Sequence, residues 1–395
     1  MCKFLKDDQV VGYNTREGLQ NYLDFRKKHD RWLESSINSM RIISGEADPE
    51  QFKRKHNCLL PVEGIKECCE QGTNMFLELY TSINGTMKRG VIPIRNTAVR
   101  TILDRARING FSLVNDVEDA GINVLPDNKK AEIISDCLRL YSAQAKVLYR
   151  DEEISAVHSG QYAILTEADI IKNFEEKLTE DFSDWSFEDA TVSHSFFSAS
   201  YRLNCEEIEE DIQMMLSDIG EDATSIKSKV RLFSSDVGTA AVHVLSFLEI
   251  DGHAISFGKP KTIKHAGKKT VEDIKKETGK LFSVFKECPE DMKRLSETKI
   301  EHPAGCLRGI AKEMHLPKKI ACETADELEE RTVGTCTAYE IYWYLNDIAG
   351  KYEAACDDVF RNMNVRETVA ECLMLDFRKF DKEFEWARKE KEDVE

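Results

Sequence analysis

Residues 185–265 alternate between apolar and polar side chains, and this period of two constrains the fold more than any other feature. Between 191 and 203 the alternation places Tyr201 and Leu203 on one side of an extended chain and Phe196 on the other. Asp251-Gly252 lies between two apolar runs, which is a strong signal for a tight β-hairpin. The pattern therefore predicts an antiparallel sheet. Its expected strands are residues 191–203, 228–234, 240–250 and 253–265.

Both flanks of this region show helical spacing of their apolar residues instead. The expected helices are residues 15–45, 62–83, 95–109, 126–148, 168–178, 270–286 and most of 292–395, and one acidic helix, 206–219, interrupts the strands. The last helix of the chain carries Val369, Leu373, Phe377, Phe380 and Phe384. This order predicts the α+β class, with a central antiparallel sheet and helices between helical N- and C-terminal parts. The expected parts are residues 1–150, mainly helical; 151–287, the sheet with helices; and 288–395, helical.

The charge balance restricts the classes of partner. The chain of 395 residues carries a net charge of −17, and 41% of its residues are hydrophobic. Proteins that bind duplex DNA by neutralising phosphates are usually basic, so the overall charge argues against that role, although not against a local basic groove. No signal-peptide h-region follows residues 1–8, and no apolar run approaches the roughly 18 residues of a membrane span. We therefore expect a cytoplasmic protein that does not enter a membrane.

Complete catalytic or cofactor motifs are missing from the sequence. There is no GxGxxG, HExxH or GxSxG, and Gly267-Lys268-Lys269-Thr270 lacks the upstream glycine of a phosphate loop. The twelve cysteines form no CxxC pair, so they are expected to be reduced thiols without structural zinc. We accordingly predict no catalytic residue, no metal ligand and no cofactor, and we favour a binding protein over an enzyme.

Two acidic segments have the composition of a cation site. Residues 151–153 and 206–211 hold clustered carboxylates, which divalent cations prefer. The same residues are favoured at helix starts by the helix dipole, and we expect this structural role. His194 and His243 fall in expected strands, and His158 falls in residues 153–165, which are expected to form a strand, a bend and a strand. In such stretches a structural histidine is more common than a catalytic base.

A lysine-rich segment, residues 259–280, contrasts with the acidic remainder. The segment contains eight lysines and three acidic residues, so its net charge is +5. A basic strand that leads into a basic helix suits the phosphate backbone of a single-stranded nucleic acid, and aromatic residues of the same sheet would stack bases. The alternative is an edge strand that lysines protect against aggregation. The candidate nucleic-acid-binding residues are Lys259, Lys261, Lys264, Lys268, Lys269, Lys275 and Lys276.

Four segments resemble a known family. They are Val147-Leu148-Tyr149-Arg150 with residues 155–165, Ser234-Ser235-Asp236-Val237-Gly238, Asp251-Gly252, and residues 337–342. In this order they are similar to the arginine-led "AVLSDRYA" segment, the "NSEVG" turn, the Asn-Gly hairpin and the "TAWDxY" helix of the phage/plasmid-like family of unknown function. Ser234 replaces the asparagine of the turn, and Ile250 or its neighbour replaces the cysteine of the hairpin. The resemblance implies a phage or plasmid context and no particular chemistry.

Three functions remain open at this point. The first is association with single-stranded nucleic acid, as a non-catalytic accessory of recombination or replication. The strand, strand, strand, helix order of residues 228–286 is similar to the core of single-strand annealing proteins. The second is an interaction protein that binds or inhibits a host protein in counter-defence, with the acidic surface as the contact. The third is a metal-dependent nuclease using acids such as Asp236. A homo-oligomer is compatible with each.

Overall fold

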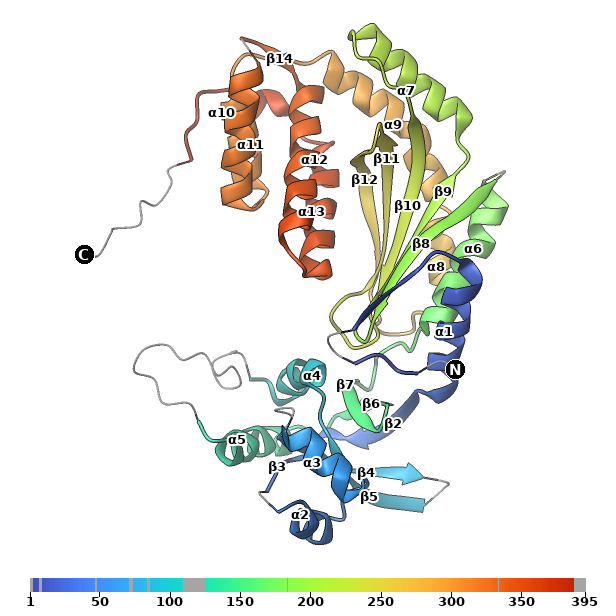
Figure 1. The fold of residues 1–395 in the computed structure, drawn as a ribbon, viewed down its shortest axis with the longest axis vertical. Coiled ribbons are helices and arrows are strands. Elements are labelled where there is room, and N and C mark those ends of the chain that lie inside the picture. Colours follow the sequence, from blue (N-terminus) through green and yellow to red (C-terminus); the bar gives the residue numbers. More distant parts are fainter. Residues whose placement is uncertain are drawn as a thin grey trace, which may run out of the picture.

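The computed structural model describes residues 3–6, 9–46, 48–70, 74–83, 86–108, 125–182, 184–332 and 334–386. These residues form two lobes (Figure 1). The small lobe comprises the described residues between Arg31 and Ser159. The large lobe comprises β1 and α1 together with the described residues from 160 onward. Both lobes contain helices and antiparallel strands, so the predicted α+β class is confirmed.

The large lobe is built on a six-stranded antiparallel sheet in the order β1-β8-β9-β10-β11-β12. Its strands are β1 (Val10–Tyr13), β8 (Trp185–Ser193), β9 (Phe197–Leu203), β10 (Ile226–Ser234), β11 (Val242–Ile250) and β12 (His253–Ile263). The period of two predicted β10, β11 and β12, and Ile250 pairs with His253 across the Asp251-Gly252 turn. Both turn residues have positive φ, as a two-residue hairpin that follows strand twist requires. The single strand expected over 191–203 is instead the end of β8, a turn at 194–196 and β9, and β1 was not predicted.

Helices cover both faces of this sheet (Figure 1). The main core lies on the face of Leu232 and Val244, where α6, α8 and α9 pack. Their neighbours in the chain, Phe233 and Leu245, point to the other face, where α13 covers them. The helices of this lobe are α1 (Arg16–His29), α6 (Glu167–Asp181), α7 (Glu206–Asp218), α8 (Val271–Thr278), α9 (Leu281–Ser296), α10 (Pro303–Glu313), α11 (Lys318–Arg331), α12 (Ala338–Ala355) and α13 (Val359–Cys372), with a short pair β13 (Lys299–Ile300) and β14 (Cys336–Thr337).

The small lobe holds two three-stranded sheets, β2-β6-β7 and β3-β4-β5. Its strands are β2 (Arg31–Ser36), β3 (Arg41–Ser44), β4 (Met75–Ile83), β5 (Thr86–Pro93), β6 (Gln144–Arg150) and β7 (Glu153–Ser159); its helices are α2 (Pro49–His56), α3 (Val62–Glu70), α4 (Asn96–Ala106) and α5 (Asp127–Arg139). A separate apolar core lies between α4, α5 and these sheets, with Ile102, Ile134 and Val147 fully buried.

The two expected limits between parts fall inside elements of the structure. The limit at Arg150 lies in the β6–β7 hairpin, and the chain passes to the large lobe after Ser159. The limit at 287–288 lies within α9. The first 150 residues contain strands as well as helices, and β1 pairs with β8 of the large lobe.

Five helix predictions were wrong in part. The helix expected over 15–45 ends at His29, and β2 and β3 follow. The helix expected over 62–83 ends at Glu70, and Met75–Ile83 is strand β4. The helix expected over 126–148 ends at Arg139, and Gln144–Arg150 is strand β6. The helix expected over 270–286 is divided into α8, which ends at Thr278, and α9. The last helix ends at Cys372, and Phe377–Phe380 is a short 3-10 turn, η3, whose segment packs on α10. In the part of the chain described, no helix has the length and apolar character to cross a membrane.

Candidate functional site

The lysine-rich segment forms the edge strand β12, a loop and helix α8, as the sequence predicted. Lys259 and Lys261 lie on β12, Lys264 follows the strand, and Lys268 lies in the loop before Thr270 caps α8. A β-bulge at residues 258–260 interrupts the alternation, because Leu245 of β11 lies opposite three residues of β12. The bulge breaks the alternation between Lys259 and Lys261, so these two side chains need not lie on the same face of β12.

Ion pairs divide the lysines of this segment into two groups. Lys269 pairs with Asp273 at 2.9 Å, Lys275 with Glu176 at 2.8 Å, and Lys280 with Glu277 at 2.6 Å. The other five make no ion pair with any residue that the structure describes. We call them the unpaired lysines: Lys259, Lys261, Lys264, Lys268 and Lys276. All but Lys261 are exposed, and Lys261 is half-buried.

Helices α12 and α13 cover the first part of the β12 edge. The Ser256 N–H donates to Asn346 Oδ1 at 2.8 Å, and the Ser256 carbonyl accepts from the Tyr342 hydroxyl. Arg366 donates to the Ala254 carbonyl at 3.2 Å. The lysines begin where this cover ends. Edge protection is one explanation for Lys259 and Lys261, but it does not explain the unpaired lysines beyond the strand.

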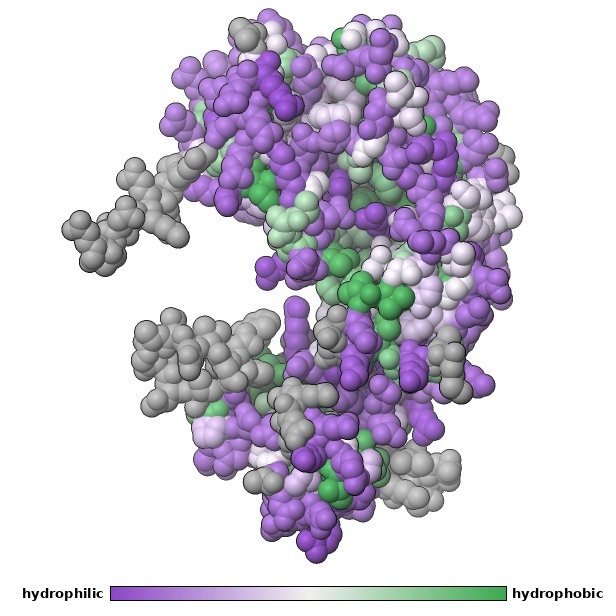
Figure 2. Space-filling view, viewed as in Figure 1, coloured by the Kyte–Doolittle hydropathy of each residue, from purple (hydrophilic) through white to green (hydrophobic). Residues whose placement is uncertain are grey.

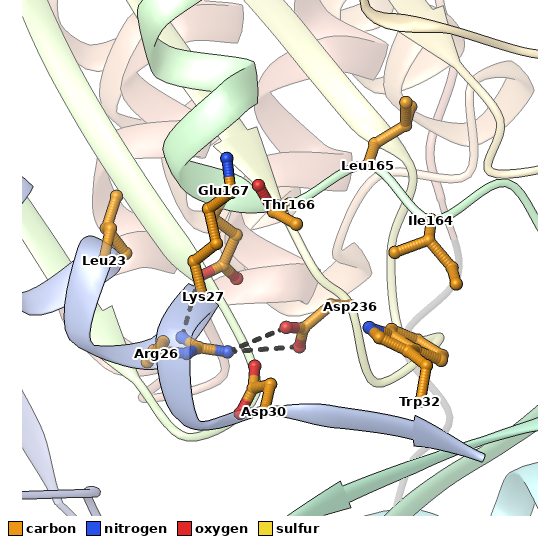
Figure 3. A pocket seen from close by; sticks show the side chains of 10 residues that line it. All are labelled: Leu23, Arg26, Lys27, Asp30, Trp32, Ile164, Leu165, Thr166, Glu167 and Asp236. Carbon is orange, nitrogen blue, oxygen red and sulfur yellow. Dashed lines mark hydrogen bonds and ion pairs between the residues drawn. The ribbon is translucent and has the colours of Figure 1, made fainter. Parts of the chain in front are cut away.

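A buried ionic cluster lies where the two lobes meet (Figure 3). Arg26, in the last turn of α1, contacts Asp236 Oδ2 at 3.0 Å and Glu167 Oε2 at 2.8 Å. Arg150, at the end of β6, donates two hydrogen bonds to Asp30, at 2.8 and 2.6 Å, and also binds Asp236. We call these five residues the junction cluster. It joins α1, β6, α6 and the β10–β11 turn, so it fixes the lobes against each other.

The electrostatics of this cluster favour a structural role for Asp236. Burial alone would raise the pKa of Asp236, but Arg150 and Arg26 hold it well below its usual range. Its carboxylate therefore bonds two guanidinium groups and is not free to hold a cation. Among the described residues, no three His, Cys, Asp or Glu side chains are grouped as metal ligands. The junction cluster thus gives the nuclease hypothesis no support.

The acidic segments also have structural roles. Asp151 and Glu152 form the turn of the β6–β7 hairpin, both with positive φ, and Glu153 pairs with Arg95 at 3.0 Å. At the start of α7, Glu209 accepts a hydrogen bond from the Ser228 N–H at 2.7 Å. These contacts agree with the structural interpretation of both segments.

Glu167 predicts a pH dependence of stability. Burial raises its pKa to about 8, against the opposing attraction of Arg26. The folded chain then binds a proton that the unfolded chain has lost, so this residue makes stability fall as the pH rises from about 4.5 to about 8. We expect Glu167→Gln to remove that fall. The free energy of unfolding of the variant, measured by urea denaturation, should therefore rise relative to that of the wild type between pH 5 and pH 8.5. If the free energies of unfolding of the variant and the wild type differ by the same amount at pH 5 and at pH 8.5, the expectation is contradicted.

A cleft lies between the lobes beside the junction cluster. It has a volume of about 280 Å³, and its walls come from α4, β7, the β10–β11 turn and the chain after β12. Three rings are stacked along it: His158 and Tyr162 have centroids 3.8 Å apart, and Tyr162 and His265 5.2 Å apart, each pair nearly parallel. Figure 2 shows the surface indented between the lobes, with hydrophobic residues where the lobes join and hydrophilic residues over most of the remaining surface.

Gly238 allows the β10–β11 turn to lie close to His158 of β7. Gly238 has φ of 83°, and a Cβ at this position would lie 2.8 Å from His158 Cε1. The His158 Nε2–H donates to the Asp236 carbonyl at 2.9 Å, and burial lowers the pKa of His158 to about 4. Burial likewise lowers the pKa of His194. Both histidines are neutral at pH 7, in agreement with their predicted structural role.

Two of the four segments that carry the family resemblance meet at this junction. Arg150 belongs to the first, His158 and Tyr162 to its continuation, and Asp236 and Gly238 to the second, yet they lie within one network of contacts. The other two segments, Asp251-Gly252 and residues 337–342, lie at the opposite end of β11, where Asp251 and Tyr339 line one pocket. Comparison of the chain with known families, curated proteins and solved structures finds no match. The phage/plasmid-like family stays a prediction.

Proposed function

We propose that this chain binds single-stranded nucleic acid, as a non-catalytic accessory in the replication or recombination of a phage or plasmid. The observation that carries the proposal is the row of five unpaired lysines from β12 to α8. The chain has a net charge of −17, and the neighbouring Lys269, Lys275 and Lys280 are already neutralised by carboxylates. Cations left without a partner in such a protein are available for phosphates.

A single strand fits this surface better than a duplex. The row of lysines is narrow, because it follows one strand edge, one loop and one short helix. A single strand carries fewer charges than a duplex, so it meets less repulsion from the acidic surface. Lys264 also lines the cleft whose wall contains the stacked rings. Proteins that bind single strands typically combine cations for the backbone with aromatic residues for the bases.

Two triple variants of equal charge test the proposal. Lys259→Gln/Lys261→Gln/Lys264→Gln removes three unpaired cations, whereas Lys269→Gln/Lys275→Gln/Lys280→Gln removes three that are already paired. Each phosphate contact contributes about 0.7 to the salt slope for single strands, so losing three should weaken binding by about 100-fold at 0.1 M salt. The slope of log K against log salt should fall by about 2. The measurement is fluorescence anisotropy with a labelled oligothymidylate.

The control triple should retain most of the affinity, because its lysines are not free to bind phosphate in the folded chain. Equal losses in both variants would show that only net charge matters, and would contradict the assignment of the unpaired lysines. Binding by neither wild type nor variants would contradict the function itself.

A further inference from the structure

Two cations without carboxylate partners face the cleft between the lobes. Arg105 comes from α4 of the small lobe, and Lys264 from the end of β12 in the large lobe. Neither makes an ion pair with a residue that the structure describes. Arg105 Nε is buried and forms no hydrogen bond with the described part of the chain. A buried N–H of a guanidinium normally has an acceptor, so Arg105 Nε is available to an acceptor from outside the described chain.

The surroundings of Arg105 compensate its charge poorly. Burial lowers the pKa of Arg105, because the charge loses water and gains no ion pair. Asp104 is the one carboxylate residue on the described cleft wall, and it is exposed to solvent, which weakens its attraction. The two positive charges of Arg105 and Lys264 and the one negative charge of Asp104 therefore give the described cleft wall a net charge of +1.

The opposite side of the cleft offers rings and an acceptor. His158, Tyr162 and His265 all line it. Because His158 donates from Nε2 to the Asp236 carbonyl, its Nδ1 carries a lone pair and is an acceptor in the neutral ring. The cleft thus combines two cations for a phosphate with aromatic edges and one acceptor for a base or sugar. Its 280 Å³ is near the lower end of small-ligand pockets, which hold about 300–1,000 Å³.

We infer that this cleft holds one nucleotide of the bound strand, with its phosphate between Arg105 and Lys264 and its base or sugar against the ring wall. The inference rests on the proposed function, since Lys264 belongs both to the cleft and to the unpaired lysines. It adds a contact from the small lobe, so the strand bridges the two lobes. The surface outside the cleft recognises only the phosphate backbone.

The test compares Arg105→Gln with Arg100→Gln, a change of an exposed arginine on the same helix. Because a hydrogen bond to a charged group is worth about a factor of ten in affinity, Arg105→Gln should bind oligothymidylate about tenfold more weakly. Arg100→Gln should bind like the wild type. Arg105→Lys keeps the charge and should restore most of the affinity, which separates lost binding from lost folding.

Competition identifies the ligand. Thymidine 5′-monophosphate should displace the labelled strand at lower concentration than inorganic phosphate does from the wild type, and this advantage should vanish in Arg105→Gln. If Arg105→Gln binds as the wild type does while the lysine triple variant is weak, the inference is overturned and the proposed function stands. Equal competition by inorganic phosphate and the nucleotide also overturns the inference. If the wild type binds no strand at all, both are overturned.

Discussion

Arg150→Met is expected to lower the free energy of unfolding by about 3–5 kcal/mol, because it leaves buried carboxylates without their partner. Arg150 is 1% exposed and satisfies both Asp30 and Asp236, and it also donates to the His194 carbonyl at 3.0 Å. Methionine fills a similar volume but supplies no charge. Urea denaturation followed by circular dichroism measures the loss, and faster proteolysis between the lobes should accompany it.

The matched control is Arg361→Met. Arg361 pairs with Asp358 at 3.3 Å on the surface, where its side chain is 71% exposed. A pair of this kind contributes between zero and about 1 kcal/mol, so the control should lose no more than that. Equal, small losses in both variants would mean that the junction cluster does not hold the lobes together.

Gly305→Ala is expected to destabilise the fold by about 1–3 kcal/mol, although alanine is the better helix former. Gly305 lies in α10, and a Cβ there would sit 2.1 Å from the Lys382 carbonyl oxygen and 3.0 Å from the Phe384 nitrogen. Both atoms are backbone, so the segment from Phe377 to residue 386 must move. Thermal unfolding measures the loss, and proteolysis after η3 should become faster.

Gly309→Ala on the same helix is the control. A Cβ at Gly309 would meet Phe380 at ordinary distances, 3.5 Å from its ring and 3.9 Å from its carbonyl oxygen. Helix propensity should then prevail and leave this variant as stable as the wild type or more stable by up to about 1 kcal/mol. If both alanines stabilise, α10 does not pack on the C-terminal segment as described.

The central sheet was predictable because its signals are local. Alternation places Ala199, Tyr201 and Leu203 in the main core, all of them fully buried, and Thr270 caps α8 with Asp273 in a capping box. Strand β4 was missed for an equally local reason. Phe76, Leu77 and Leu79 are all fully buried, so the strand is apolar on both faces and its short apolar run does not differ from that of a helix.

The candidate site was predictable only in part. The lysine-rich segment is contiguous, so composition alone locates it, but which lysines are paired depends on Glu176 of α6, far away in sequence. The junction cluster joins Arg26 to Asp236 across 210 residues and Arg150 to Asp236 across 86. Arg105 carries no sequence signal at all, because its significance comes from the chain that packs opposite it. Long-range packing decides these features, and no local pattern encodes it.

The most direct test of the proposed function is the salt dependence of binding between the wild-type chain and a single-stranded oligonucleotide. If the five unpaired lysines each meet one phosphate, log K should fall against log salt with a slope of about −3.5, and binding should be measurable at about 50 mM salt. The same titration with duplex DNA of equal length should give weaker binding. No binding at about 50 mM salt, or binding that is independent of salt, would contradict the account.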